Sequence, residues 1–191
     1  MFIDYITLML VNMAAGLVIL AWFFLKGLGG PNERAWASGL AMVGLVALIA
    51  GFAMTFTWPI PKLEKVNLAW ANAAYGETTV MLGILFLGAA LAVARSWSLL
   101  PVTVYGCLAG IIGIVLGVRI GVLGLSQEPI MTAAGFVLTG LGGPLSLLVA
   151  LAPERRRVRI ITAIVLCIAA AIWLLTAILG YWAHLAMLSK V

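Results

Sequence analysis

The stretch WASGLAMVGLVALIAGFAMTFTW, residues 36–58, decides the fold, because none of its side chains is charged. A bilayer core about 30 Å thick needs roughly 20 apolar residues in one helix. The stretch is long enough to meet this requirement. It is therefore predicted to cross a membrane.

Further stretches of the same kind lie on either side of it. With ends set at charges, Gly or Pro, the predicted spans are residues 5–25, 36–58, 75–94, 101–125, 130–152 and 158–188. The connections between them are too short for a soluble domain. We predict an all-α fold, a polytopic transmembrane helix bundle of about six membrane-spanning helices with short loops. Residues 1–191 are predicted to form a single integral membrane domain.

The composition excludes other classes of protein. Apolar residues make up 65% of the 191 residues and charged residues 9%, whereas soluble domains average about 25% charged residues. The net charge of +5 does not indicate nucleic acid, because four basic residues stand together in residues 155–159, beside long apolar segments. Cys107 and Cys167 lie within apolar stretches and do not indicate a disulfide framework.

The distribution of basic residues predicts the orientation. Basic residues are expected on the cytoplasmic side of a membrane protein. One side of the predicted bundle carries three of them, Lys62, Lys65 and Lys190, and the other carries seven: Lys26, Arg34, Arg95, Arg155, Arg156, Arg157 and Arg159. We therefore expect an inner-membrane protein with both termini outside the cell.

Glycine and proline mark two of the predicted helices. Gly113, Gly117 and Gly121 form a stripe that is predicted to pack closely on a neighbouring helix. Arg119 lies on the opposite side, which predicts a helix enclosed on both faces. Pro144, in the sequence GLGGP, is expected to kink or locally open the fifth span.

Four ionisable residues fall on the predicted outer side. They are Asp4, Glu77, Arg119 and His184. Ionisable groups in a membrane are costly, so their default interpretation is functional, and Glu77 is predicted to face the bundle and pair with Arg119. The alternative is that Asp4 and Arg119 lie at the interface in contact with water.

His184 is the single histidine, and it shares a helical stripe with Trp173, Ala177, Gly180 and Tyr181. The simplest interpretation of such a histidine is an interfacial residue. Imidazole is also the commonest protein ligand of metals and a usual axial ligand of haem. The residue is therefore a candidate ligand.

Our first hypothesis is an outward-facing pocket made by Asp4, Glu77, Arg119, Tyr181 and His184 that holds a haem or a metal ion for redox chemistry or sensing. With haem b, His184 is one axial ligand and Met81 or Met54 the other, while Arg119 pairs with a propionate. With a divalent metal ion the ligands are His184, Glu77 and Asp4, a set that suits Zn, Fe or Mn.

Two alternatives remain open. The same groups could serve a cofactor-free module that binds or transports a small solute or protons. The chain could also be a structural subunit of a larger membrane complex, docked on a second copy or on another membrane protein through its glycine stripe. The sequence lacks the motifs HExxH, GxSxG with triad partners, the P-loop and CxxCH, so no enzyme class is assigned.

Several segments resemble one family. MFIDYITLMLVNMAAG at residues 1–16, TWPIP, AAYGE, GFVLTGLGG and the terminal YWAHL are similar to a family of small prokaryotic predicted membrane proteins with no assigned activity. The resemblance extends over nearly the whole chain. It implies an integral membrane protein and supplies no catalytic or binding residues.

Overall fold

The computed structural model describes residues 4–57 and 69–188, and in these ranges helices joined by short turns form the structure, without a β-strand. Six helices among the described residues are long and apolar enough to cross a membrane. The predicted all-α bundle is confirmed, and its spans fit a multi-pass membrane protein. The elements in chain order are α1 (Tyr5–Trp22), the π-helix η1 (Phe23–Gly27), the 3-10 turn η2 (Glu33–Ala35), α2 (Trp36–Thr57), α3 (Ala69–Ala71), the π-helix η3 (Asn72–Glu77), α4 (Thr78–Arg95), α5 (Leu100–Leu123), α6 (Pro129–Leu151) and α7 (Arg156–Leu188).

Local sequence explains where these helices begin and end. Asp4 caps α1, because its Oδ1 accepts a hydrogen bond of 3.1 Å from the backbone N–H of Thr7. Pro129 is the first residue of α6, where its missing N–H costs nothing. At the C-terminal end of α5, Gly124 takes a left-handed conformation with φ of 61° and terminates the helix.

The observed third span differs from the predicted one. The third span begins at Ala69 rather than at residue 75, because α3 and η3 continue directly into α4. The predicted end of the second span, Trp58, lies outside the described residues. Pro144 lies inside α6, which continues to Leu151, so the helix does not end at this proline.

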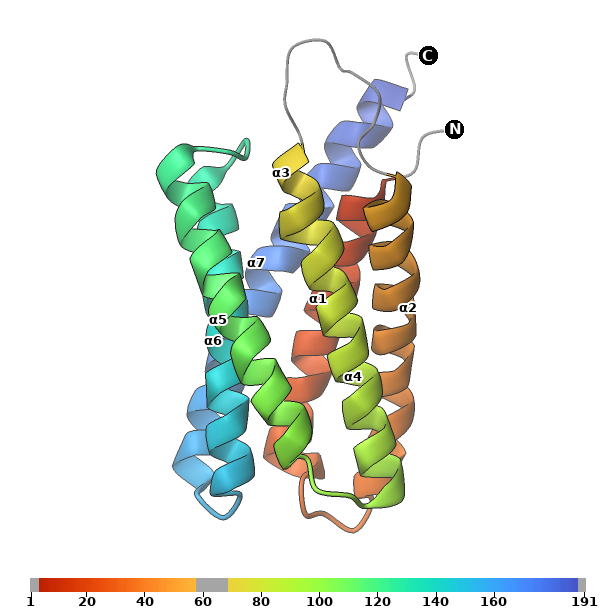
Figure 1. Ribbon diagram of the computed structural model, residues 1–191, viewed down its shortest axis with the longest axis vertical. Helices are drawn as coiled ribbons and strands as arrows, with labels where there is room; N and C mark the ends of the chain where they lie inside the picture. The colour runs from red at the N-terminus through yellow and green to blue at the C-terminus, as the bar shows by residue number, and fades with distance from the viewer. Residues whose placement is uncertain (1–3, 58–68, 189–191) are drawn as a thin grey trace.

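The helices run along the long axis of the molecule, with α2 and α4 on one side and α5 and α6 on the other (Figure 1). The pairs that pack most closely are α5 with α6, α2 with α4, and α1 with α7. α4 and α5 follow one another in the chain but contact each other much less than these pairs do. The bundle is therefore least closed between α4 and α5.

Glycine allows α5 and α6 to approach backbone to backbone. A Cβ atom at Gly110 would overlap the carbonyl oxygen of Gly140, and one at Gly117 would lie 2.8 Å from Cβ of Phe136. α6 thus packs along the predicted glycine stripe. The prediction that α5 is enclosed on both faces is wrong, since Arg119 is exposed and Val122 on that side is 71% exposed.

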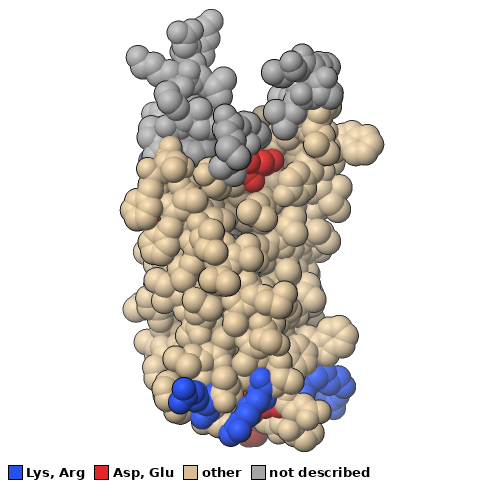
Figure 2. Space-filling model, turned by 90° about the vertical axis from the view of Figure 1, so that its right-hand side faces the viewer, with Lys and Arg blue, Asp and Glu red and all other residues tan. Residues whose placement is uncertain are grey.

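The two ends of the bundle differ in charge. The end that carries Asp4 and His184 is called the terminal face here. The opposite end is called the basic face, and Figure 2 shows Lys and Arg gathered there. Its basic residues are Lys26, Arg34, Arg95, Arg155, Arg156, Arg157 and Arg159. Lys62, Lys65 and Lys190, which the orientation argument placed opposite, lie outside the described residues.

Candidate functional site

At the terminal face the structure brings together two of the predicted site residues. Nδ1 of His184, near the end of α7, lies 2.5 Å from Oδ2 of Asp4, which precedes α1. The side chain of Asp4 is 17% exposed and that of His184 is 33% exposed. The carboxylate therefore joins the beginning of the first helix to the last helix.

This environment shifts the protonation of Asp4. Burial raises the pKa of the carboxyl group, but hydrogen bonds from His184 and from Thr7 oppose this and prevail. The pKa of Asp4 consequently lies below its usual value. The carboxylate is ionised at neutral pH and can orient the imidazole ring through Nδ1.

The other residues of the predicted polar pocket are exposed, and none of them forms a hydrogen bond or ion pair with Asp4 within the described chain. Glu77, the last residue of η3, is exposed, and so is Arg119 on α5. Among the ion pairs of the described residues there is none between Glu77 and Arg119. Tyr181, on α7, is 40% exposed. Only Asp4 and His184 of the five proposed pocket residues form a hydrogen bond or ion pair with each other within the described chain.

The geometry can be compared with the needs of a metal ion. Within residues 4–57 and 69–188, no three His, Cys, Asp or Glu side chains are grouped closely enough to hold a metal. Of the proposed ligands His184, Glu77 and Asp4, only His184 and Asp4 contact each other in the described chain. A carboxylate that holds a histidine ring is a common arrangement around metals, but two ligands alone do not make a structural site.

The proposed haem ligands are likewise distributed over different surroundings. Met81 lines a cavity inside the bundle, and His184 is not among the residues that line it. Met54 is fully buried in a small cluster with Met9, Ala50 and Ala71. The described residues therefore do not place an imidazole and a thioether on opposite sides of one space, as an axial pair requires.

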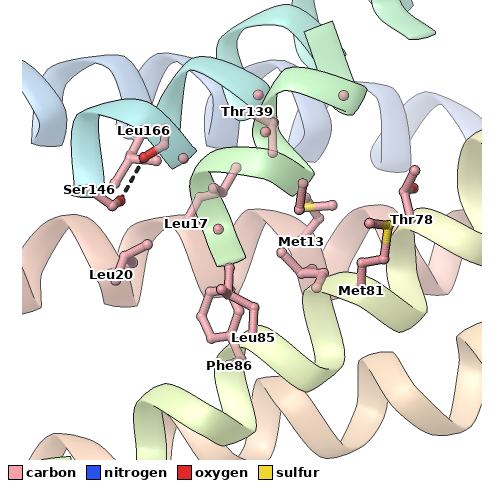
Figure 3. Close-up of a pocket in the computed structure, with 18 of the residues that line it drawn as sticks. Met13, Leu17, Leu20, Thr78, Met81, Leu85, Phe86, Thr139, Ser146 and Leu166 are labelled. Carbon is pink, nitrogen blue, oxygen red and sulfur yellow. Dashed lines mark hydrogen bonds between the residues drawn. The ribbon is translucent and has the colours of Figure 1, made fainter. Parts of the chain in front are cut away.

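The interior of the bundle contains an apolar cavity of about 140 Å³, mainly between α1 and α4 on one side and α5, α6 and α7 on the other. Its lining along α1 and the following η1 extends from Met9 to Phe24, which corresponds to about 22 Å along the helix axis. Figure 3 shows Met13, Leu17 and Met81 directed into this space. None of the described side chains that line it carries a formal charge.

Aromatic side chains build one wall of the cavity. The Tyr75 ring meets Phe136 edge-on at 5.3 Å between ring centroids, and Phe136 meets Trp173 in the same way at 5.3 Å. Trp173 is buried, and its indole N–H donates a 2.8 Å hydrogen bond to Oγ1 of Thr139. The polar atom of the tryptophan is satisfied, so this wall presents apolar rings to the cavity.

Sequence reasoning did not find this cavity. Its residues come from helices far apart in the chain, and each one is an ordinary apolar or small residue in a membrane span. The hydroxyl groups of Thr103 and Ser146, which also line it, carry no signal in the sequence because Thr and Ser are common in such helices. Only the packing of helices around a shared space identifies them.

The described spans fit a multi-pass helical membrane protein, and its helices surround an apolar cavity. The chain belongs to DUF981, a family of proteins of unknown function whose family model matches residues 1–187. The resemblance to a family without an assigned function is thereby confirmed. No curated protein and no solved structure matches the chain.

Proposed function

We propose that this protein binds a lipid-soluble, uncharged molecule inside the membrane, in the cavity between α1 and α4 and the α5–α7 group. Of the three hypotheses, this is a form of the cofactor-free binding module. The observation that carries it is the cavity of about 140 Å³, lined by uncharged side chains from all six long helices. A neutral occupant needs no charged partner there. A charged occupant would bind poorly, because burying its unpaired charge costs free energy.

The size of the space favours an occupant over a void. Unfilled apolar cavities destabilise a protein by about 24 cal/mol per Å³, so a void of this size would cost about 3 kcal/mol. Cavities of comparable volume lined by apolar side chains exclude water and accept apolar molecules. A membrane-dissolved molecule would recover the contacts that the lining residues otherwise lack.

The entry that we propose lies between α4 and α5. These helices meet near the basic face, where the position of a Cβ atom on Gly106 is 3.1 Å from Leu85 and that on Gly88 is 3.7 Å from Val102. Further toward the terminal face, Thr78 and Met81 on α4 and Gly110 and Gly113 on α5 line the cavity instead. A molecule in the bilayer could enter sideways through this region.

Haem or metal binding stays as a second candidate, supported by the contact between Asp4 and His184. An aspartate on Nδ1 fixes the ring in the way that it does for many metal-bound histidines. Absorption spectra and elemental analysis of gently purified protein test this candidate. A Soret band or a bound metal that disappears in His184→Ala supports it, and the absence of both from protein supplied with haem and metal rejects it.

For orientation we propose that the basic face lies on the cytoplasmic side of the inner membrane. Its seven Lys and Arg side chains belong to short connections and helix ends, which are the positions that determine topology. Both termini would then be outside. That this protein binds a partner in the membrane, either a second copy or another membrane protein, remains a separate hypothesis.

Photo-crosslinking in nanodiscs tests the binding proposal. We would use a dodecane that carries a diazirine near one end and would map labelled peptides by mass spectrometry. Label is expected on cavity-facing segments of α1 and α4, and Ala109→Phe, which fills the cavity from α5, should remove it.

Leu108→Phe is the matched control, because Leu108 is 63% exposed on the neighbouring lipid-facing side of α5. This variant should keep the cavity label. Equal labelling of both variants, or label only on lipid-facing residues, would reject the cavity as a binding site.

A further inference from the structure

A second space adjoins the cavity at the basic face. It has a volume of about 150 Å³, and its lining includes Glu33, Trp97 and Pro153. Four residues line both spaces: Phe24, Leu99, Thr103 and Ser146. The two spaces therefore share a wall made by these four residues.

The backbone around this shared wall is held in place. Phe24 belongs to the π-helix η1, and its carbonyl oxygen accepts a hydrogen bond from Nε of Arg159 on α7. Arg159 also donates from Nη2 to the carbonyl oxygen of Leu28 at 3.2 Å. Single π-helical turns frequently occur at functional sites. Phe24 is 3% exposed and provides a firm apolar part of the wall.

The polar part of the wall consists of two hydroxyl groups. Oγ of Ser146 donates to the carbonyl oxygen of Gly142 at 2.6 Å, as drawn in Figure 3, and Oγ1 of Thr103 donates to that of Leu100 at 2.9 Å. Both residues are 8% exposed. Because each hydroxyl hydrogen is already used, each oxygen offers lone pairs and can accept a hydrogen bond from a ligand.

We propose that Thr103 and Ser146 offer alternative acceptors for the single hydrogen bond that the hydroxyl head of a neutral single-chain amphiphile, a long-chain alcohol, can donate while its tail lies in the apolar cavity. This inference rests on the proposed function and names the ligand class of the same site. A donor is favoured because both wall hydroxyls accept, and an ion is disfavoured because no charged side chain lines the cavity.

A competition experiment distinguishes the head from the tail. The diazirine-bearing dodecane labels the protein in nanodiscs, and dodecanol or dodecyl methyl ether is added to displace it. The two competitors have similar tails, but only dodecanol donates a hydrogen bond. We expect dodecanol to compete about tenfold better, the effect of one hydrogen bond in an apolar site.

In the double variant Thr103→Val and Ser146→Ala, dodecanol should displace the probe no better than the ether does. Competition by the ether should not change, which shows that the cavity is intact. The control is Thr162→Val, because Thr162 is also buried and its hydroxyl likewise donates to its own helix, to Val158, but it lines neither space. This variant should keep the preference for dodecanol.

The outcomes separate the two proposals. If the probe does not label the cavity of the parent protein, the proposed function itself fails. If the probe labels the cavity and the two competitors displace it equally well, only the alcohol assignment is overturned. This outcome is measured on the parent protein alone. A preference for dodecanol that persists in the double variant also overturns the role of Thr103 and Ser146.

Discussion

Asp4 and His184 are 180 positions apart in the chain, and yet Oδ2 of the first lies 2.5 Å from Nδ1 of the second. The same carboxylate caps α1 by accepting the N–H of Thr7. One side chain thus performs two tasks, a local one within the first turn and a long-range one toward α7. Its two tasks can be separated by substitution.

Asp4→Ala is expected to destabilise the protein more than His184→Ala. Loss of the histidine removes a hydrogen bond to a charged group, about 1.5–3 kcal/mol. Loss of the aspartate also removes the helix cap, which adds about 0.5–2 kcal/mol. Asp4→Asn should keep the cap and lose only the charge on the pair. Thermal unfolding in detergent measures these differences, and additive effects in the double variant would contradict the contact.

The Asp4 contact should make stability depend on pH in the acid range. The pKa of Asp4 is lower in the folded protein than its usual value, so the contribution is complete above about pH 4 and is lost as the pH falls through the folded-state value. Melting temperatures of the parent should therefore decline more on acidification than those of Asp4→Asn. Parallel curves for the two proteins would show that this carboxylate is not responsible.

Gly117→Leu should damage folding much more than Gly88→Leu. A Cβ atom at Gly117 would lie 2.8 Å from Cβ of Phe136 and 3.0 Å from the carbonyl oxygen of Ala133, whereas one at Gly88 meets only Val102 at 3.7 Å. Overpacking of this kind costs about 1–3 kcal/mol. Yield and thermal stability in detergent provide the test. Equal loss in both variants would mean that the α5–α6 contact does not limit stability.

Arg159→Met should lower stability, although Arg156→Met should not. Arg159 donates to the carbonyl oxygens of Phe24 and Leu28, and removing it leaves both acceptors without this donor, at a cost of about 1–3 kcal/mol. Arg156 is exposed and lies in the first turn of α7. The free energy of unfolding of each variant distinguishes the two. A similar small effect at both positions would indicate that the side chain of Arg159 is replaceable by water.

The topology can be measured by cysteine labelling in cells. In a background with Cys107 and Cys167 replaced, Glu154→Cys should react with a membrane-impermeant thiol reagent only after the inner membrane is opened. The reason is the seven basic residues of the basic face. A tag at the C-terminus should be accessible from outside. Labelling of Glu154→Cys in intact spheroplasts would reverse the proposed orientation.

The membrane spans could be predicted from the sequence because their signal is local. Residues 36–58 are apolar enough to cross a bilayer wherever the other helices lie. The lipid itself penalises charged side chains, so a span without them can be recognised from its own sequence. The glycine stripe at Gly113, Gly117 and Gly121 was predictable for a similar reason. A helix face made of glycine allows another helix to pack closely against it. This can be predicted without knowing which helix is the partner.

Tertiary structure alone decided which side chains meet. The sequence predicted that Asp4, Glu77, Arg119 and His184 share one end of the bundle, but common depth does not fix their direction around each helix axis. Asp4 and His184 meet, while Glu77 and Arg119 are exposed. In a bilayer the apolar faces of a helix are nearly equivalent toward lipid and toward protein, so hydropathy does not choose between them. The cavity, with Thr103 and Ser146 on its wall, exists only because six helices leave a common space that none of their sequences encodes separately.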